Sequence, residues 1–120
     1  GDLNNDSLVL KLRYKDFSAL FCADIRGEAA ERLLAAQGGE LPATVLKAPH
    51  HGGRLGNAAF EFLEKVNPEI AVISGRIKDI DRELFCALVD LRARIYITAE
   101  NGAVILTYKK DKYTAAAALK

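Results

Sequence analysis

Short apolar runs of strand length alternate along the chain with segments of helical periodicity, and this alternation constrains the fold more than any other feature. After two opening strands, three helical segments each separate one predicted strand from the next. Strands that alternate with helices are typical of a mostly parallel or mixed sheet with helices packed on it. The sequence therefore predicts an α/β fold in which residues 1–120 form one compact domain.

The predicted strands differ in how apolar they are. Residues 7–14 alternate Leu or Tyr with Val9, Lys11 and Arg13, which indicates one solvent-exposed face, whereas residues 17–22 are more uniformly apolar. Strands are predicted at residues 7–14, 17–22, 43–47, 70–73, 94–98 and 103–108. Lys15-Asp16 predicts a tight turn, and Asn101-Gly102 predicts a hairpin between the last two strands.

Three predicted helices follow the strands at residues 28–36, 57–66 and 81–91, with Asn57 and Asp81 as N-caps of the second and third. The apolar side chains expected to face the core are Phe60, Leu63 and Val66, with Phe62 nearby, and Leu84, Phe85, Leu88 and Leu91. Residues 109–120 are polar and then rich in alanine, so we expect a helical extension or a frayed tail.

The composition limits the classes of partner. The formal net charge is +1, from 17 basic and 16 acidic side chains, which excludes a global attraction to nucleic acid or to an anionic membrane. No apolar run approaches the ~20 residues that cross a bilayer, and no signal-like N-terminus is present. Cys22 and Cys86 lie in apolar patterns, which predicts buried free thiols. The chain lacks methionine, and we expect it to be a segment of a longer protein.

Both histidines of the chain lie side by side in the sequence Pro49-His50-His51-Gly52, directly after a predicted strand. Such a strand delivers imidazoles to the carboxyl edge of the sheet, where open α/β sheets bind their ligands. Two consecutive residues rarely bind one ion in the same way, so we expect one ring on a metal and the other on substrate or in a supporting contact. The alternative is a loop with two solvated histidines.

Asp24 follows the most apolar predicted strand. A carboxylate there has to be hydrogen-bonded, used as a cap or metal-bound, because burying it unpaired is costly. Asp24 and His51 follow successive strands separated by one crossover helix, and this topology can bring them within several ångströms of each other. A carboxylate with an imidazole suits Zn²⁺ or Mn²⁺. The alternative is that Asp24 caps the helix that begins near Glu28 or bonds to nearby amides.

Five blocks of the sequence, in order and over nearly the whole chain, resemble the metallo-β-lactamase fold. In particular they resemble the ComEC-type competence proteins, the DNA-internalisation channels of naturally transformable bacteria. The blocks are residues 4–10, 21–25, 46–52, 66–74 and 96–102. The resemblance implies an αββα sandwich with a one- or two-metal site at the sheet edges and an activity of phosphodiester hydrolysis on DNA.

The resemblance also implies roles for single residues. Asp24 matches the family's metal-bridging aspartate, and the His-His-Gly block supplies the last metal ligand. We assign that ligand to His51. His50 is assigned to the catalytic site as a contact to substrate or as a supporting partner of the metal ligand, and the sequence leaves the reverse order open. Asn4 falls where many relatives carry a ligand histidine, and we assign it to substrate binding.

The chain also departs from the family pattern. The family's H-x-H-x-D-H block is absent, so the chain resembles the C-terminal half of the fold, one half of the αββα sandwich. Ala23 replaces the usual Gly before the bridging aspartate, and Gly53 replaces the usual Ser after His-His-Gly. A Gly-His-Pro block that relatives often carry is replaced by residues 76–82, which contain no histidine.

Four basic residues, Lys47, Arg54, Arg76 and Lys78, fall after or near predicted strand ends. Cationic side chains at a phosphodiester site position the backbone and stabilise developing charge. We assign Lys47 and Arg54 to substrate binding, with Lys47 as the stronger candidate. The alternative for each is a solvated surface side chain.

Two functions follow. The first is part of a metal-dependent, DNase-like hydrolase domain in a DNA-uptake protein of the bacterial plasma membrane, on its extracytoplasmic side, with DNA and the rest of the competence channel as partners. The second is a non-catalytic module of the same fold that guides DNA or serves a structural role beside a membrane channel. For this polypeptide we expect no robust nuclease activity and weak or no metal affinity. We also expect a homodimer through the exposed face of the half sandwich.

Overall fold

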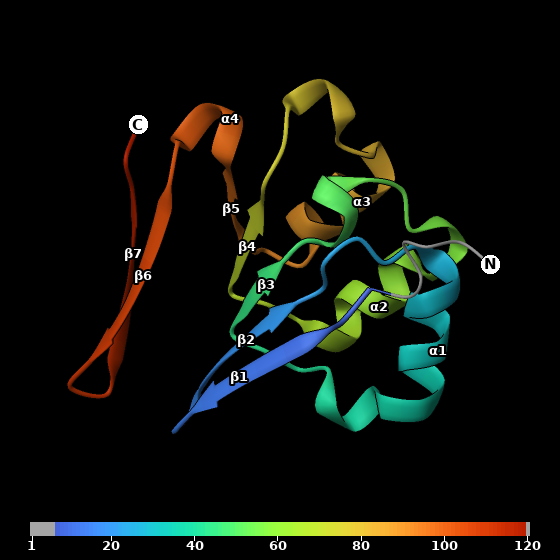
Figure 1. The fold of residues 1–120 in the computed structure, drawn as a ribbon, viewed down its shortest axis with the longest axis horizontal. Coiled ribbons are helices and arrows are strands. Elements are labelled where there is room, and N and C mark those ends of the chain that lie inside the picture. The colour runs from blue at the N-terminus through green and yellow to red at the C-terminus, as the bar shows by residue number, and fades with distance from the viewer. Residues whose placement is uncertain (1–6, 120) are drawn as a thin grey trace.

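Five strands form one mixed sheet, and a two-stranded hairpin lies over one of its faces (Figure 1). The structure is a computed structural model that describes residues 7–119, so Asn4 lies outside the described residues. The sheet comprises β1 (Leu10–Tyr14), β2 (Phe17–Phe21), β3 (Val45–Lys47), β4 (Ile70–Ile73) and β5 (Arg94–Ile97), in that spatial order. β1 is antiparallel to β2, and β2 to β5 are mutually parallel. The α/β class and the mixed sheet predicted from the sequence are confirmed.

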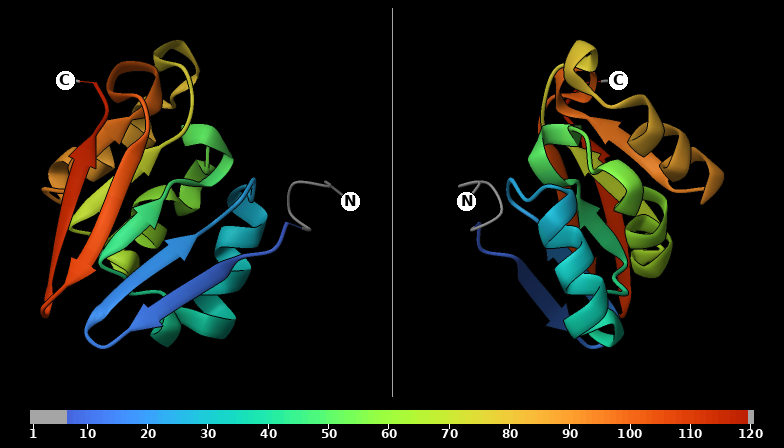
Figure 2. Two further views of the ribbon diagram at one scale, coloured as in Figure 1. Left: turned by 60° about the vertical axis from the view of Figure 1, so that its left-hand side comes forward. Right: turned by 90° about the vertical axis from the view of Figure 1, so that its right-hand side faces the viewer.

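Three helices connect the parallel strands, and all of them lie on the same face of the sheet (Figure 2). They are α1 (Gly27–Gln37), α2 (Ala59–Val66) and α3 (Arg82–Asp90). Consecutive crossovers between neighbouring parallel strands share one hand, which places their helices on a common side. Asp81 caps α3 as predicted, since its Oδ2 accepts a hydrogen bond from the Leu84 amide at 3.0 Å.

The main hydrophobic core lies between the sheet and these helices. Its largest fully buried side chains include Phe62, Leu46, Leu63, Leu84 and Leu88. Phe60 and Phe85, in contrast, are 48% and 36% exposed, so their predicted places in the core are wrong. The buried face of α2 is formed by Ala59, Phe62, Leu63 and Val66, because these positions lie together on the side toward the sheet.

Two further predictions about the helices are wrong. Asn57 does not cap α2, because a short 3-10 turn at Gly56–Ala58 precedes the helix and Ala58 occupies the N-cap position. Cys86 is exposed on α3, whereas Cys22 is a buried free thiol as predicted. No helix within residues 7–119 has the length and apolar character needed to cross a bilayer.

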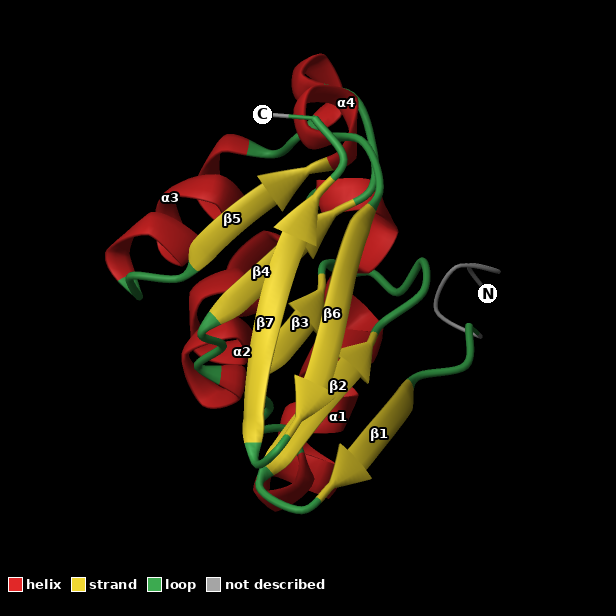
Figure 3. Ribbon diagram, turned by 90° about the vertical axis from the view of Figure 1, so that its left-hand side faces the viewer, coloured by secondary structure: helices red, strands yellow, loops and turns green. Residues whose placement is uncertain are grey.

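The opposite face of the sheet is covered by a hairpin of β6 (Val104–Lys109) and β7 (Lys112–Ala117), which Figure 3 shows in front of β3 and β4. Ala19, Val45 and Ile70 are the buried residues of this smaller core. Aromatic rings surround them: Phe17 lies 5.6 Å from Tyr108 and 5.5 Å from Tyr113 between ring centroids.

The predicted hairpin around Asn101-Gly102 and the predicted helical or frayed tail are therefore wrong. Residues Thr98–Asn101 form the short helix α4, and β5 enters the sheet beside β4 instead of pairing with β6. Asn101 stabilises this break, because its side-chain oxygen accepts the Ile97 amide at 2.8 Å. The actual hairpin turns at Lys110 and Asp111, whose φ angles of 53° and 63° suit a two-residue hairpin turn.

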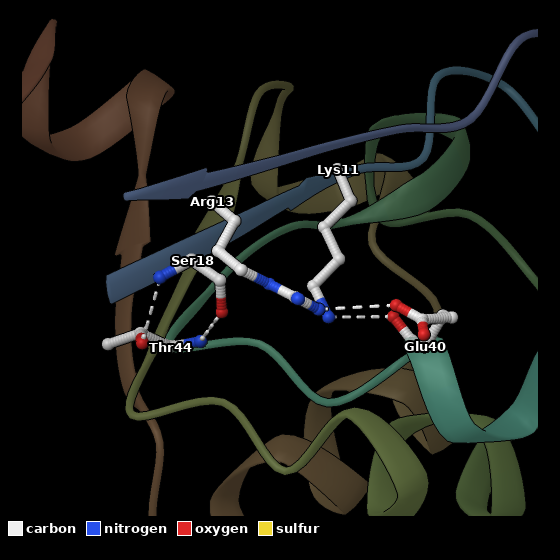
Figure 4. Close-up of polar contacts among 5 residues, drawn as sticks. All are labelled: Lys11, Arg13, Ser18, Glu40 and Thr44. Carbon is white, nitrogen blue, oxygen red and sulfur yellow. Dashed lines mark hydrogen bonds and ion pairs between the residues drawn. The ribbon is translucent and has the colours of Figure 1, made fainter. Parts of the chain in front are cut away.

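β1 begins at Leu10 rather than at Ser7, and it is more exposed than its alternating pattern predicts. Leu10 and Leu12 are 55% and 56% exposed, because the hairpin covers the inner strands and leaves most of β1 open (Figure 3). On the other side of the strand, Lys11 and Arg13 bond to Glu40 at 2.8 and 3.2 Å (Figure 4).

Candidate functional site

The carboxyl ends of β2, β3, β4 and β5 meet at one rim of the sheet, because these strands are parallel neighbours. Asp24 follows β2, the two histidines follow β3, Ser74 follows β4 and Thr98 follows β5. Asp24 and the two histidines, which the sequence singled out, thus lie at the edge where open α/β sheets bind ligands.

Asp24 and His51 form a pair at this rim. The Oδ1 atom of Asp24 lies 3.3 Å from Nε2 of His51, and the two side chains are 46% and 60% exposed. The predicted proximity of the two residues is confirmed. The alternative that Asp24 caps α1 is wrong, because Arg26 occupies the N-cap position of that helix and makes no side-chain capping hydrogen bond.

The other ring nitrogen of His51 fixes its tautomer. Nδ1 lies 2.8 Å from the carbonyl oxygen of Ser74 and 3.3 Å from its hydroxyl. A carbonyl oxygen only accepts, so Nδ1 carries a proton. In the neutral ring, Nε2 then carries no proton, and its lone pair faces a carboxylate oxygen of Asp24. Two such acceptors repel each other unless a proton or a metal ion lies between them.

The donor set of this pair fits a divalent metal. Two ligands about 2.0–2.1 Å from a tetrahedral Zn²⁺ are separated by about 3.3–3.4 Å, close to the observed separation of the two atoms. Histidines that bind metals usually donate their other N–H to a carbonyl or carboxylate, as His51 does to Ser74. Within residues 7–119, no group of three or more His, Cys, Asp or Glu side chains is arranged to hold a metal ion. If a zinc ion bound at this pair, Asp24 and His51 would supply two of the three protein ligands that a catalytic zinc site usually has.

The backbone around the histidines is strained. His50 and His51 have φ angles of 50° and 54°, and Ala23 beside them has a φ of 50°. Left-handed backbone costs a non-glycine residue roughly 1–2 kcal/mol. Hydrogen bonds hold the loop in place, from the His50 amide to the Ala23 carbonyl at 2.8 Å and from the Asp81 amide to the Gly52 carbonyl at 2.7 Å. Strain of this kind clusters at functional sites, where the surrounding structure maintains it.

Because of the left-handed turn, the side chains of the two histidines contact different neighbours. The His50 ring lies 6.5 Å from the His51 ring between centroids and borders a separate pocket that Arg26 and Arg54 also line. A Cβ atom at Gly53 would collide with the His50 ring. Serine, the residue usual at this position in the family that the sequence resembles, is therefore incompatible with the observed position of the ring.

Two further basic candidates, Lys47 and Arg76, lie at the end of β3 and shortly after β4. Lys47 is in register with Phe21 and Val72, on the side of the sheet that faces the hairpin. Its charge lowers the pKa of the Cys22 thiol, but burial outweighs this effect and raises that pKa to about 12. Arg76 forms an ion pair with Asp79 at 2.8 Å. Arg54 lines the same pocket as His50.

Three residues of the rim were missed in the sequence. Ser74 orients His51, Thr98 Oγ1 accepts the Gly75 amide at 3.0 Å, and Arg26 lines the pocket beside His50. A signal existed for Ser74 and Thr98, because Ser74 directly follows the predicted strand at residues 70–73 and Thr98 ends the predicted strand at residues 94–98. No comparable signal marked Arg26, whose position depends on how α1 packs against the loop at residues 53–56.

Comparison with known proteins gives two curated relatives. The chain is 28% identical over 110 residues to ComE operon protein 3 of Bacillus subtilis. The matched region covers 88% of this chain and 14% of that protein. It is 31% identical over 71 residues to the uncharacterized protein YcaI of Escherichia coli. That matched region covers 59% of this chain and 9% of the relative. The chain thus spans a small part of each relative. No family model and no solved structure matches it.

Proposed function

We propose that Asp24 and His51 are two ligands of a divalent-metal site for phosphodiester hydrolysis, in a domain of metallo-β-lactamase type that takes part in DNA uptake. The observation that carries the proposal is the 3.3 Å separation between Nε2 of His51 and a carboxylate oxygen of Asp24, in a ring whose Nδ1 is bonded to the Ser74 carbonyl. The uptake context rests on the family resemblance of the sequence and on the similarity to ComE operon protein 3 over most of the chain.

In this proposal the chain's own groups bind and orient. Ser74 holds the His51 ring so that Nε2 points to Asp24, and the Asp24 carboxylate supplies negative charge to the same point. The partial exposure of both side chains leaves an open approach for an extended substrate. Zn²⁺ or Mn²⁺, when bound, supplies Lewis-acid activation of a phosphodiester and of water. The further ligands come from a preceding segment of the longer protein.

The test is a titration of the ¹⁵N-labelled chain with Mn²⁺, whose unpaired electrons broaden nearby amide signals even when binding is weak. We expect broadening first at residues 23–25, 50–52 and 74–75, and we expect Asp24→Ala to abolish it. Asp90→Ala, which removes an exposed carboxylate at the end of α3, is the matched control and should change nothing. If the broadening is unchanged in Asp24→Ala, the proposed metal site is refuted.

Hydrolysis itself is tested in the longer protein. We expect Asp24→Ala and His51→Ala each to lower DNA cleavage at least 100-fold while the protein stays folded, because outright loss of a ligand removes the metal-dependent step. Cleavage that survives both substitutions would leave only the non-catalytic role beside a DNA channel.

A further inference from the structure

We infer that the pocket beside His50 binds a phosphate group, held by the guanidinium groups of Arg26 and Arg54. This inference deepens the proposed function, on which its role in catalysis rests, by assigning the residues that would hold a substrate phosphate. Arg26 had no role in the sequence-based prediction. Binding of phosphate in the pocket does not require the metal, so the two proposals can fail separately.

The pocket has a volume of about 450 Å³ and lies between the start of α1 and the loop that follows the histidines. The residues that line it are Arg26, Gly27, His50, Arg54, Leu55 and Gly56. None of the six is acidic, and three carry a cationic or potentially cationic side chain. With a formal net charge of only +1, the chain has no strong overall attraction for anions, so binding of an anion would depend on local donor groups such as these.

Close packing of the backbone gives the pocket its shape. A Cβ atom at Gly27 would collide with the carbonyl oxygen of Leu55, so glycine is required for the start of α1 to approach the loop. The Leu55 side chain is 1% exposed and anchors the loop in the main core. Arg54 and Gly56, which flank Leu55, are thereby held at the surface next to Arg26. Arg26 and Arg54 thus belong to backbone segments that pack closely against each other.

The chemistry of the lining suits a phosphate. A guanidinium group presents planar, paired N–H donors that match two phosphate oxygens, and two such groups from different elements can grip one anion. Arg26 is also the N-cap of the 11-residue helix α1, so the pocket opens at the positive end of a helix dipole. This dipole adds to the arginine charges and does not by itself make a site.

The location links the pocket to the proposed metal pair. His50 borders the pocket, His51 belongs to the pair, and their rings are 6.5 Å apart between centroids. A nucleic acid strand that places one phosphate between Arg26 and Arg54 would pass close to Asp24 and His51. The pocket therefore fits a phosphodiester of a nucleic acid strand as its ligand.

The test uses two probes, inorganic phosphate and a dithymidine phosphodiester, each titrated into the ¹⁵N-labelled chain with a metal chelator present. We expect both probes to shift the amide signals of residues 26–28 and 53–56 and the side-chain Nε signals of both arginines. The double substitution Arg26→Ala with Arg54→Ala should weaken binding at least tenfold. Conservative replacement of both residues by Lys should give an intermediate loss, because the charge is kept but the paired donors are not.

Arg13→Ala is the matched control, because Arg13 is an exposed arginine that bonds to Glu40 on β1. It should leave binding unchanged. Shifts that spread over lysines elsewhere, or that persist in the double variant, would overturn the inference. If inorganic phosphate binds and the dithymidine phosphodiester does not, the assignment of a nucleic acid strand as ligand would be overturned. Phosphate binding that persists in Asp24→Ala while Mn²⁺ broadening is lost would show that the pocket and the metal pair are separate sites. Failure of the Mn²⁺ test alone would remove the metal proposal and leave the pocket.

Discussion

The two faces of the five-stranded sheet are covered in different ways. Three helices seal one face over a core with fully buried Leu, Ile and Phe side chains, whereas the other face carries a single hairpin over Ala19, Val45 and Ile70. The hairpin packs against these residues with partly buried side chains, Leu106, Tyr113 and Ala115, and Leu10 and Leu12 of β1 remain more than half exposed. The difference indicates that the helix face supplies most of the stability. The hairpin face contributes less and leaves apolar surface uncovered.

The largest effect is expected on the helix face. Phe62 is fully buried there, and Phe62→Ala should lower the free energy of unfolding by about 3–5 kcal/mol, through lost burial and the cavity left behind. Phe60 on the same helix is 48% exposed, and Phe60→Ala should cost less than about 1 kcal/mol. Urea unfolding followed by circular dichroism measures both. Equal losses would contradict the view that this face holds the core.

A smaller effect compares the two faces on a single strand. Ile73 and Ile70 are both fully buried on β4, but Ile73 faces the helices and Ile70 faces the hairpin. Removal of one methyl group from a core costs about 0.5–1.5 kcal/mol. We expect Ile73→Val near the upper end of that range and Ile70→Val near the lower end, because the hairpin can settle onto the smaller side chain. A larger loss for Ile70→Val would reverse the comparison.

A local pH effect is expected at the margin of the hairpin. The Tyr108 hydroxyl donates to Asp16 Oδ1 at 2.8 Å, and this hydrogen bond, with the nearby negative charges, raises the pKa of Tyr108 to about 12. Because the pKa is raised, the bond is present below the ordinary tyrosine pKa and is lost as pH rises toward 12. Asp16→Asn should bring the pKa back toward 10, as measured by tyrosinate absorbance. Asp79→Asn serves as the control, and an unchanged titration in Asp16→Asn would show that the bond does not form.

The smallest effect on folding is expected on β1. Leu12 is 56% exposed, so Leu12→Ser should change the free energy of unfolding by less than about 1 kcal/mol. The homodimer expected from the sequence stays a prediction, and this strand offers a way to test it. If two copies pair through this surface, light scattering should show a mass that rises with concentration and falls in Leu12→Ser. A monomeric mass at all concentrations would contradict the dimer.

Several features of the fold could be predicted because local patterns agreed with the final packing. The uniform apolar character of residues 17–22 predicted the inner strand β2, and the Asp81 cap predicted the start of α3. The C-terminal region was predicted wrongly because Asn101-Gly102 carries a strong local hairpin signal. Pairing of β5 with β4 overrode that signal, since it joins Ile95 and Ile97 to the main core.

The residues of the candidate site could also be predicted only in part. Asp24 and His51 could be predicted as neighbours because parallel strands deliver their carboxyl ends to one rim. The separation of His50 from His51 could not be predicted, because it depends on two consecutive left-handed residues that the surrounding hydrogen bonds hold in place. Arg26 could not be predicted for a similar reason, since only the packing of α1 against Leu55 brings it beside Arg54.

By itself the sequence determined the α/β class, the order of most elements and the rim at which the reactive side chains gather. These follow from the periodicity of apolar residues and from chain direction, which are local properties. Only the tertiary structure decided which face the last two strands cover, which nitrogen of His51 faces Asp24 and which residues form the cationic pocket. Such outcomes depend on contacts between segments far apart in the chain, and no local pattern encodes them.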